Sequence, residues 1–183
     1  MSTRLARGGR FTDRSKQFGF TFNGKRFTGY AGDTLASALL ANDQMLMGRS
    51  FKYHRPRGVV ASGAEEPNAL VGLGEGARSE PDQRVTTTEL FDGLVADSQN
   101  HWPSLDFDVG GVNARLSRFL PAGFYYKTFL WPRAFWKHVY EPVIRQSAGL
   151  GKAPHPEVRD ADRYEHFHAH VDLLVIGGGV AGL

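Results

Sequence analysis

A glycine-rich turn near the carboxyl end of the sequence is the strongest chemical signal in the chain. Gly177, Gly179 and Gly182 fill the three glycine positions of a G-x-G-x-x-G motif, directly behind the apolar run VDLLVI at residues 171–176. Such a run is typical of a parallel strand buried on both faces. The first glycine permits a tight turn, the second lets a pyrophosphate approach the backbone, and the third allows close helix packing. The pattern predicts the opening of a Rossmann domain that binds NAD or FAD, with a chance glycine turn as the alternative.

The position of this motif limits what the chain is expected to do with it. The following helix, the second strand and the acidic residue expected about 20 positions downstream are not among the 183 residues. We therefore expect residues 171–183 to be the first strand and turn of a truncated dinucleotide-binding domain that does not bind NAD alone. An apolar strand without neighbours is expected to be disordered, to pack opportunistically or to promote aggregation.

A second candidate is the basic stretch GRSFKYHRPRG at residues 48–58, within a long loop at residues 48–68. Loops of this length in a compact domain tend to be functional. Arginine presents a planar fork to phosphate or carboxylate, and aromatic faces can stack with cations. An anion clamp or docking loop and a merely solvated surface loop remain equally open. Single-stranded nucleic acid is less favoured, because nothing else in the chain supports it.

Two smaller sets of polar residues have types that could do chemistry. His166, His168 and His170 would share one face of a strand, so a metal site is conceivable. No carboxylate or thiol set joins them, so an extended linker is favoured and no metal site is predicted. Glu65 and Glu66 are adjacent, and adjacent side chains diverge, which favours a structural role over acid–base chemistry. No catalytic residue is predicted.

The elements that must hold these residues begin with a hairpin. Phe18, Phe20 and Phe22 alternate with small residues at the strand period, and Asn23-Gly24 supplies a tight turn before a second strand at residues 25–30. The first strand is expected to start after a basic arm that orders only against something else.

A helix and two more strands complete the expected domain. Asp33 can accept hydrogen bonds from the first amides of a helix over residues 34–42, with Leu35, Ala38 and Leu39 on its buried face. Runs at residues 69–73 and 84–90 are the candidate further strands. A hairpin followed by a helix that crosses a sheet is how a β-grasp domain starts, so the predicted fold class is α+β.

Bulky aromatic residues and frequent prolines follow from residue 101 to about 150, which predicts short helical turns wrapped over another surface, such as a neighbouring subunit, rather than a long helix. The predicted organisation is a basic arm at 1–15, a β-grasp domain at 16–100, an aromatic and proline-rich connecting segment with a linker at 101–170, and the truncated strand and turn at 171–183.

Composition narrows the kinds of site and the classes of function that the chain could have. The chain has no cysteine, which excludes disulfides, thiolate zinc sites and conventional all-cysteine iron–sulfur ligation. A net charge of +3 is too small to argue for nucleic acid. Neither a signal peptide nor an apolar run of about 20 residues is present, so a cytoplasmic, soluble chain without membrane contact is expected.

Three strings in the sequence carry a family resemblance: YAGDTLASALLAN at residues 30–42, GRSFKYHRPRG at 48–58 and EEPNALV at 65–71. Together they closely resemble the amino-terminal part of the α subunits of heterotetrameric sarcosine oxidases, and the resemblance continues to the glycine motif. In the wider family, the segment after Arg57-Gly58 holds cysteines that ligate a [2Fe–2S] cluster. Here residues 59–66 read VVASGAEE, so the resemblance implies a ferredoxin-like β-grasp fold without its iron–sulfur cluster.

The resemblance also implies a parent complex. Its α subunit would combine this domain with an NAD-binding region and a folate-binding domain, and it would assemble with β, γ and δ subunits. FAD and FMN in the complex would oxidise sarcosine, oxygen would be reduced to hydrogen peroxide, and tetrahydrofolate would accept the one-carbon unit. Only Gly177, Gly179 and Gly182 match a ligand-binding position, for NAD. The alternatives are a non-enzymatic β-grasp interaction module and a subunit of another flavin-dependent amine or imino-acid dehydrogenase.

Overall fold

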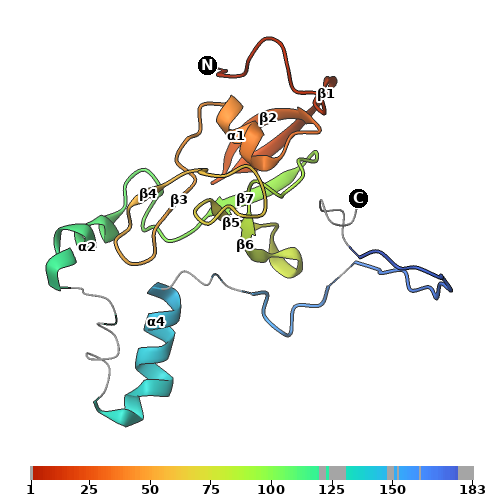
Figure 1. Cartoon of the computed structure of the whole chain (residues 1–183). Helices are drawn as coiled ribbons and strands as arrows, with labels where there is room; N and C mark the ends of the chain where they lie inside the picture. Colours follow the sequence, from red (N-terminus) through yellow and green to blue (C-terminus); the bar gives the residue numbers. More distant parts are fainter. Residues whose placement is uncertain are drawn as a thin grey trace.

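The structure is a computed structural model, and it describes residues 2–119, 123, 131–147, 151, 153–160 and 162–176. A mixed five-stranded sheet with one helix forms its centre (Figure 1). The elements of this domain are β1 (Asp13–Phe22), β2 (Lys25–Ala31), α1 (Leu35–Ala41), β3 (Gly48–Arg49), β4 (Pro56–Arg57), β5 (Leu70–Leu73), η1 (Gly76–Arg78), β6 (Glu80–Arg84) and β7 (Leu94–Ser98).

The strand order in the sheet is β2-β1-β7-β5-β6, and β3 and β4 form a separate small ladder. β1 pairs antiparallel with β2 but parallel with β7, where Phe20 lies opposite Leu94. Strand β5 runs antiparallel to both of its neighbours. This α+β arrangement is the predicted β-grasp fold.

The predicted hairpin is confirmed, including its turn. Asn23 and Gly24 have φ angles of 50° and 72°, the left-handed values that a two-residue hairpin turn needs, and Phe22 pairs with Lys25 across it. Strand β1 is longer than the phenylalanine pattern indicated. It begins at Asp13, inside the expected arm, and its register shifts between Asp13 and Gln17.

The helix lies where it was predicted, but Asp33 as its cap is wrong. Thr34 is the N-cap: its hydroxyl accepts a hydrogen bond from the Ser37 amide at 3.2 Å, and the Ser37 hydroxyl accepts one from the Thr34 amide at 3.0 Å. This reciprocal pair is a capping box. Asp33 instead accepts from the Tyr30 amide at 2.9 Å, from Arg4 at 3.0 Å and from the Ser37 hydroxyl at 2.8 Å.

The predicted strand at residues 84–90 is also wrong. β6 ends at Arg84, and the chain then turns. The Thr88 amide and hydroxyl donate to the Arg84 carbonyl at 3.1 and 2.8 Å. The threonine run therefore makes hydrogen bonds within its own turn and none in a sheet ladder. Val85 and Leu90 are nevertheless buried, which explains why the run carries apolar residues.

The core lies between α1 and the sheet. Its largest fully buried apolar side chains are Phe22, Leu35, Leu39, Met47, Leu90, Val71 and Val85. Helix and sheet approach closely at Gly29, where an added Cβ would lie 3.0 Å from the Ala38 Cβ of α1 and 2.4 Å from Leu90 Cδ2. A side chain at this position would therefore displace the Leu90 side chain and crowd α1.

Helical elements follow the sheet domain. Up to residue 119 they are the predicted short turns, but for residues 133–147 the prediction is wrong, because three elements follow one another without a break across Pro142 (Figure 1). The helical elements are η2 (Val109–Gly111), α2 (Val112–Arg115), η3 (Ser117–Phe119), η4 (Arg133–Phe135), η5 (Trp136–Tyr140) and α4 (Glu141–Ser147). Exposed aromatic side chains of this region include Phe119, Trp131 and Trp136. No helix in the described part of the chain is long and apolar enough to span a membrane.

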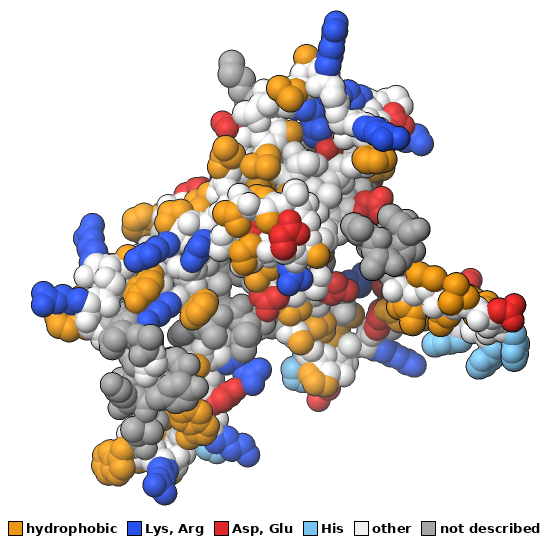
Figure 2. All heavy atoms as spheres, in the orientation of Figure 1, with side chains coloured by type: hydrophobic (Ala, Val, Ile, Leu, Met, Phe, Trp, Pro, Cys, Tyr) orange, Lys and Arg blue, Asp and Glu red, His pale blue; other side chains and the backbone are white. Residues whose placement is uncertain are grey.

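The last described segment is extended. An ion pair between Arg78 and Asp162 ties it to η1. Residues 171–176 take part in no strand pairing within the described ranges, and their apolar side chains are 57–89% exposed. Figure 2 shows this apolar stretch beside the histidines. It has the exposure expected of one strand without neighbours.

Candidate functional site

The predicted NAD-binding glycines Gly177, Gly179 and Gly182 lie outside the described residues. The segment that leads into them is extended and exposed. The NAD site therefore stays a prediction, and the described polar clusters lie in the loops of the β-grasp domain.

Arg49, the first cation of the basic loop, is a structural tether. Its Nε and Nη2 atoms donate to the Leu105 carbonyl at 3.1 and 2.8 Å, and Nη1 donates to the His54 carbonyl at 3.3 Å. The Asn100 side chain donates to the Arg49 carbonyl at 3.3 Å. The guanidinium therefore fastens the segment after β7 to the loop and does not present a free fork to an anion.

His54 fastens the same two segments. Its Nδ1 lies 2.7 Å from Oδ2 of Asp108, whose side chain is fully buried. Asp108 also accepts from the amides of Trp102 and Gly110 at 3.0 and 3.1 Å. Burial raises the pKa of Asp108, but the Trp102 amide and His54 outweigh it and leave the pKa below its usual value. An ionised Asp108 thus closes the loop against residues 102–110.

The other cations of the basic loop gather around one ring. Lys52 Nζ and the Arg55 guanidinium each lie 4.9 Å from the centre of the Tyr53 ring. Beside the loop lies a hollow of about 410 Å³, whose lining includes Arg57, Asn68, Asp82 and Gln99. Arg49 and His54 are engaged in structural contacts, so two of the side chains that were expected to clamp an anion are already occupied.

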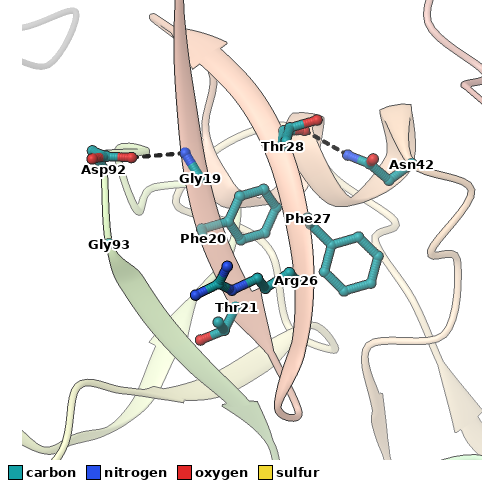
Figure 3. A pocket seen from close by; sticks show the side chains of 9 residues that line it. All are labelled: Gly19, Phe20, Thr21, Arg26, Phe27, Thr28, Asn42, Asp92 and Gly93. Atoms are coloured by element: carbon teal, nitrogen blue, oxygen red, sulfur yellow. Dashed lines mark hydrogen bonds between the residues drawn. The ribbon is translucent and has the colours of Figure 1, made fainter.

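A second hollow, of about 540 Å³, lies beside the β1/β2 hairpin (Figure 3). Two of its polar side chains serve the fold. Asp92 accepts from the Gly19 amide at 2.8 Å, and Asn42 donates to the Thr28 carbonyl at 2.7 Å. The hollow therefore offers a ligand no carboxylate that is free of a structural contact.

The most constrained polar centre is the carboxylate of Glu66, at 1% exposure. Its Oε2 accepts from the amides of Val60 and Ala61 at 2.8 and 2.7 Å. Its Oε1 accepts from the amides of Asn68 and Ala69 at 2.8 and 3.1 Å. Burial raises the pKa of Glu66, but these backbone N–H groups outweigh it, so the pKa lies below its usual value. Glu66 therefore has the predicted structural role, in a form that the sequence did not reveal.

Comparison with known families bears on this loop. Residues 15–101 match the family described as 2Fe-2S iron-sulfur cluster binding domain. The residues present do not fit such a cluster. The sequence supplies no thiolate, and the described residues contain no group of three or more His, Cys, Asp or Glu that could hold a metal ion. The loop instead holds the buried carboxylate of Glu66, which four backbone amides bind.

Among curated proteins, sarcosine oxidase α subunits match the chain along nearly its whole length. The chain is 59% identical over 182 residues to sarcosine oxidase subunit alpha of Rhizobium meliloti (strain 1021), which covers 100% of this chain and 18% of that protein. It is 33% and 29% identical to the alpha subunits of Corynebacterium sp. strains P-1 and U-96, over 93% of this chain and 13% of each relative. The chain thus spans less than a fifth of the length of these relatives.

Among solved structures, L-proline dehydrogenase from P. horikoshii aligns with 49% of this chain and 17% of its own, at 24% identity and a TM-score of 0.38. That similarity is too low to carry an argument. The sequence matches are specific, and they agree with the β-grasp architecture described above. Residues 15–101 thus resemble 2Fe-2S iron-sulfur cluster binding domains, and along its whole length the chain is similar to part of sarcosine oxidase α subunits.

Proposed function

We propose that the chain is the amino-terminal part of the α subunit of a sarcosine-oxidising complex in the cytoplasm. The observation that carries this proposal is the 59% identity over the full chain to the Rhizobium meliloti α subunit. The complex would convert sarcosine to glycine with FAD and FMN, reduce oxygen to hydrogen peroxide and pass the one-carbon unit to tetrahydrofolate. The β, γ and δ subunits would be its partners.

Within this complex, the β-grasp domain would position neighbouring parts and cofactors and would not itself transfer electrons. Two observations support a structural role. The domain has no thiolate for a cluster, and two polar side chains of its basic loop, Arg49 and His54, are engaged in internal tethers. The exposed aromatic residues of η3 to η5 would then pack against another subunit or another domain.

The intact gene product, expressed with the products of any neighbouring subunit genes, tests the proposal. We expect sarcosine to drive hydrogen peroxide formation, and we expect proline and unmethylated glycine to give little. The downstream sequence should encode a complete dinucleotide-binding domain and a folate-binding domain. A stop codon after Leu183, or peroxide formation that responds to proline but not to sarcosine, would contradict the proposal.

The NAD site has its own prediction. In the intact gene product, Gly179→Val should weaken NAD binding about 100-fold, or about 2.8 kcal/mol, because the side chain would occupy the space of the pyrophosphate. Gly178→Ala is the matched control, since the motif tolerates any residue there, and its affinity should match the unmodified protein. The 183-residue chain alone should show no saturable NAD binding by calorimetry. Equal affinities for both variants would contradict the assignment.

A further inference from the structure

The loop around Glu66 has the geometry of an anion-binding site whose anion is part of the chain. Amides from both sides of the loop, at residues 60–61 and 68–69, converge on one carboxylate. Concave arrays of backbone N–H groups of this kind bind phosphates and iron–sulfur centres. Here the array is filled by a side chain only a few residues away in sequence.

The hydrogen bonds require a group that only accepts. Each oxygen of Glu66 receives two N–H groups, which uses the four acceptor positions that a carboxylate has. A glutamine of the same shape would turn its NH2 group toward two N–H donors. The array therefore distinguishes an anion from its neutral isostere.

The charge of the carboxylate also favours an anion over its neutral isostere in this array. No ion pair to Glu66 occurs among the described residues, so the backbone N–H groups provide the stabilisation that a cation would otherwise give. Hydrogen bonds to an ionised acceptor are about twice as strong as neutral ones, and four of them offset the cost of burial. The loop is held from outside as well, because the Thr86 hydroxyl donates to the Gly63 carbonyl at 2.7 Å and Arg84 donates to the Glu66 carbonyl at 3.2 Å.

We propose that the Glu66 carboxylate has taken the place of the anionic iron–sulfur cluster for which this domain family is named, so that residues 59–69 fold around an internal anion. The loop keeps the converging N–H groups that suit a cluster, but it lacks the thiolates. It is consequently complete without metal, and the domain serves as a redox-inactive scaffold. Glu66 is thus a positioning residue for the loop.

Hydrogen exchange of the intact gene product tests this role. In Glu66→Gln, the amides of Val60, Ala61, Asn68 and Ala69 should exchange at least about tenfold faster, because their acceptor is neutralised and half of it becomes a donor. Glu65→Gln is the matched control: Glu65 is the exposed neighbour, and its neutralisation should leave these four amides unchanged. Unchanged exchange in Glu66→Gln, or equal acceleration in both variants, would overturn the proposal.

A second measurement needs no variant. The unmodified protein is incubated anaerobically with ferrous iron and sulfide under reducing conditions and then freed of unbound metal. We expect no visible iron–sulfur absorption and iron well below one equivalent per chain. A stoichiometric cluster would overturn the proposal even if Glu66→Gln fails to fold.

Discussion

Replacing Phe22 with alanine should destabilise the β-grasp domain by about 3–5 kcal/mol, the range measured for deleting a buried aromatic ring. Phe22 is 1% exposed and ends β1 opposite Ala96 of β7, in the same core cluster as Leu35 and Leu39 of α1. Its removal would leave a cavity between helix and sheet that these rigid neighbours fill only in part. No other single truncation removes a larger fully buried side chain from this core.

Hydrogen exchange of the β1 and β7 amides in the intact gene product measures this loss. Tryptophan fluorescence would not report it, because Trp102, Trp131 and Trp136 all lie beyond β7. Phe11→Ala is the matched control: that ring is 81% exposed, so its removal should change stability by less than about 0.5 kcal/mol. Similar losses for both variants would contradict the assigned core.

Replacing Arg4 with methionine should cost about 3 kcal/mol, the lower end for breaking a buried ion pair. The Arg4 guanidinium forms a two-pronged contact with Asp33, at 3.0 Å to Oδ1 and 2.6 Å to Oδ2, and the Asp33 side chain is 1% exposed. Methionine keeps most of the apolar stem but leaves the carboxylate without its cation. The Tyr30 amide and the Ser37 hydroxyl still donate to Asp33, which is why the lower end of the range applies.

The same pair predicts a pH dependence. Burial raises the pKa of Asp33, but hydrogen bonds from Arg4, Tyr30 and Ser37 outweigh it and leave the pKa below its usual value. A carboxylate with a lowered pKa adds stability above its unfolded pKa of about 3.9, and this stability is lost as the pH falls through the folded value. Denaturant unfolding of the unmodified protein and of Asp33→Asn should therefore differ most at pH 7, and the gap should close below about pH 4. A gap that stays constant with pH would contradict this assignment.

The arm that carries Arg4 shows where local sequence patterns stop being informative. Composition predicted an arm at residues 1–15 that orders only against something else. In the structure its partner is the domain itself: the Thr3 amide and the Ser2 hydroxyl each donate to the Ala41 carbonyl at 3.0 Å, at the end of α1. The glycine and arginine content gave no hint of these contacts, because they depend on where the helix ends.

The strands differ in how well the sequence predicts them, for a related reason. The β1/β2 hairpin and α1 were predictable because alternation, an Asn-Gly turn and an apolar helix face are local signals. β6 reads EPDQR, with no apolar alternation, and it is a strand only because it pairs with β5. The threonines after it have strand-like side chains but hydrogen-bond back to Arg84. The ladder with β5 decided the first case and a turn closed on Arg84 decided the second, and the side-chain pattern reveals neither.

The contacts at the candidate site could likewise be predicted only in part. A structural role for Glu66 could be predicted, but the convergence of four amides on it could not, because it requires the path of the whole loop. Arg49 and His54 looked free for an anion, since their partners Leu105 and Asp108 lie 56 and 54 residues away. An acidic residue within residues 59–66, the segment where the resemblance places cysteines in the wider family, is the sequence signal that could have pointed to Glu66.

The parallel pairing of β1 with β7 has a consequence for synthesis of the protein. The first strand to leave the ribosome takes its place between β2 and the last strand of the sheet, so the domain cannot close until residues 94–98 have emerged. Until then, the nascent hairpin exposes Phe20 and Phe22, which are buried in the finished sheet. Pairing between strands so distant in sequence slows folding, and exposed apolar strands of this kind are chaperone substrates. The domain is therefore expected to complete its fold late on the ribosome, after its entire sheet has been translated.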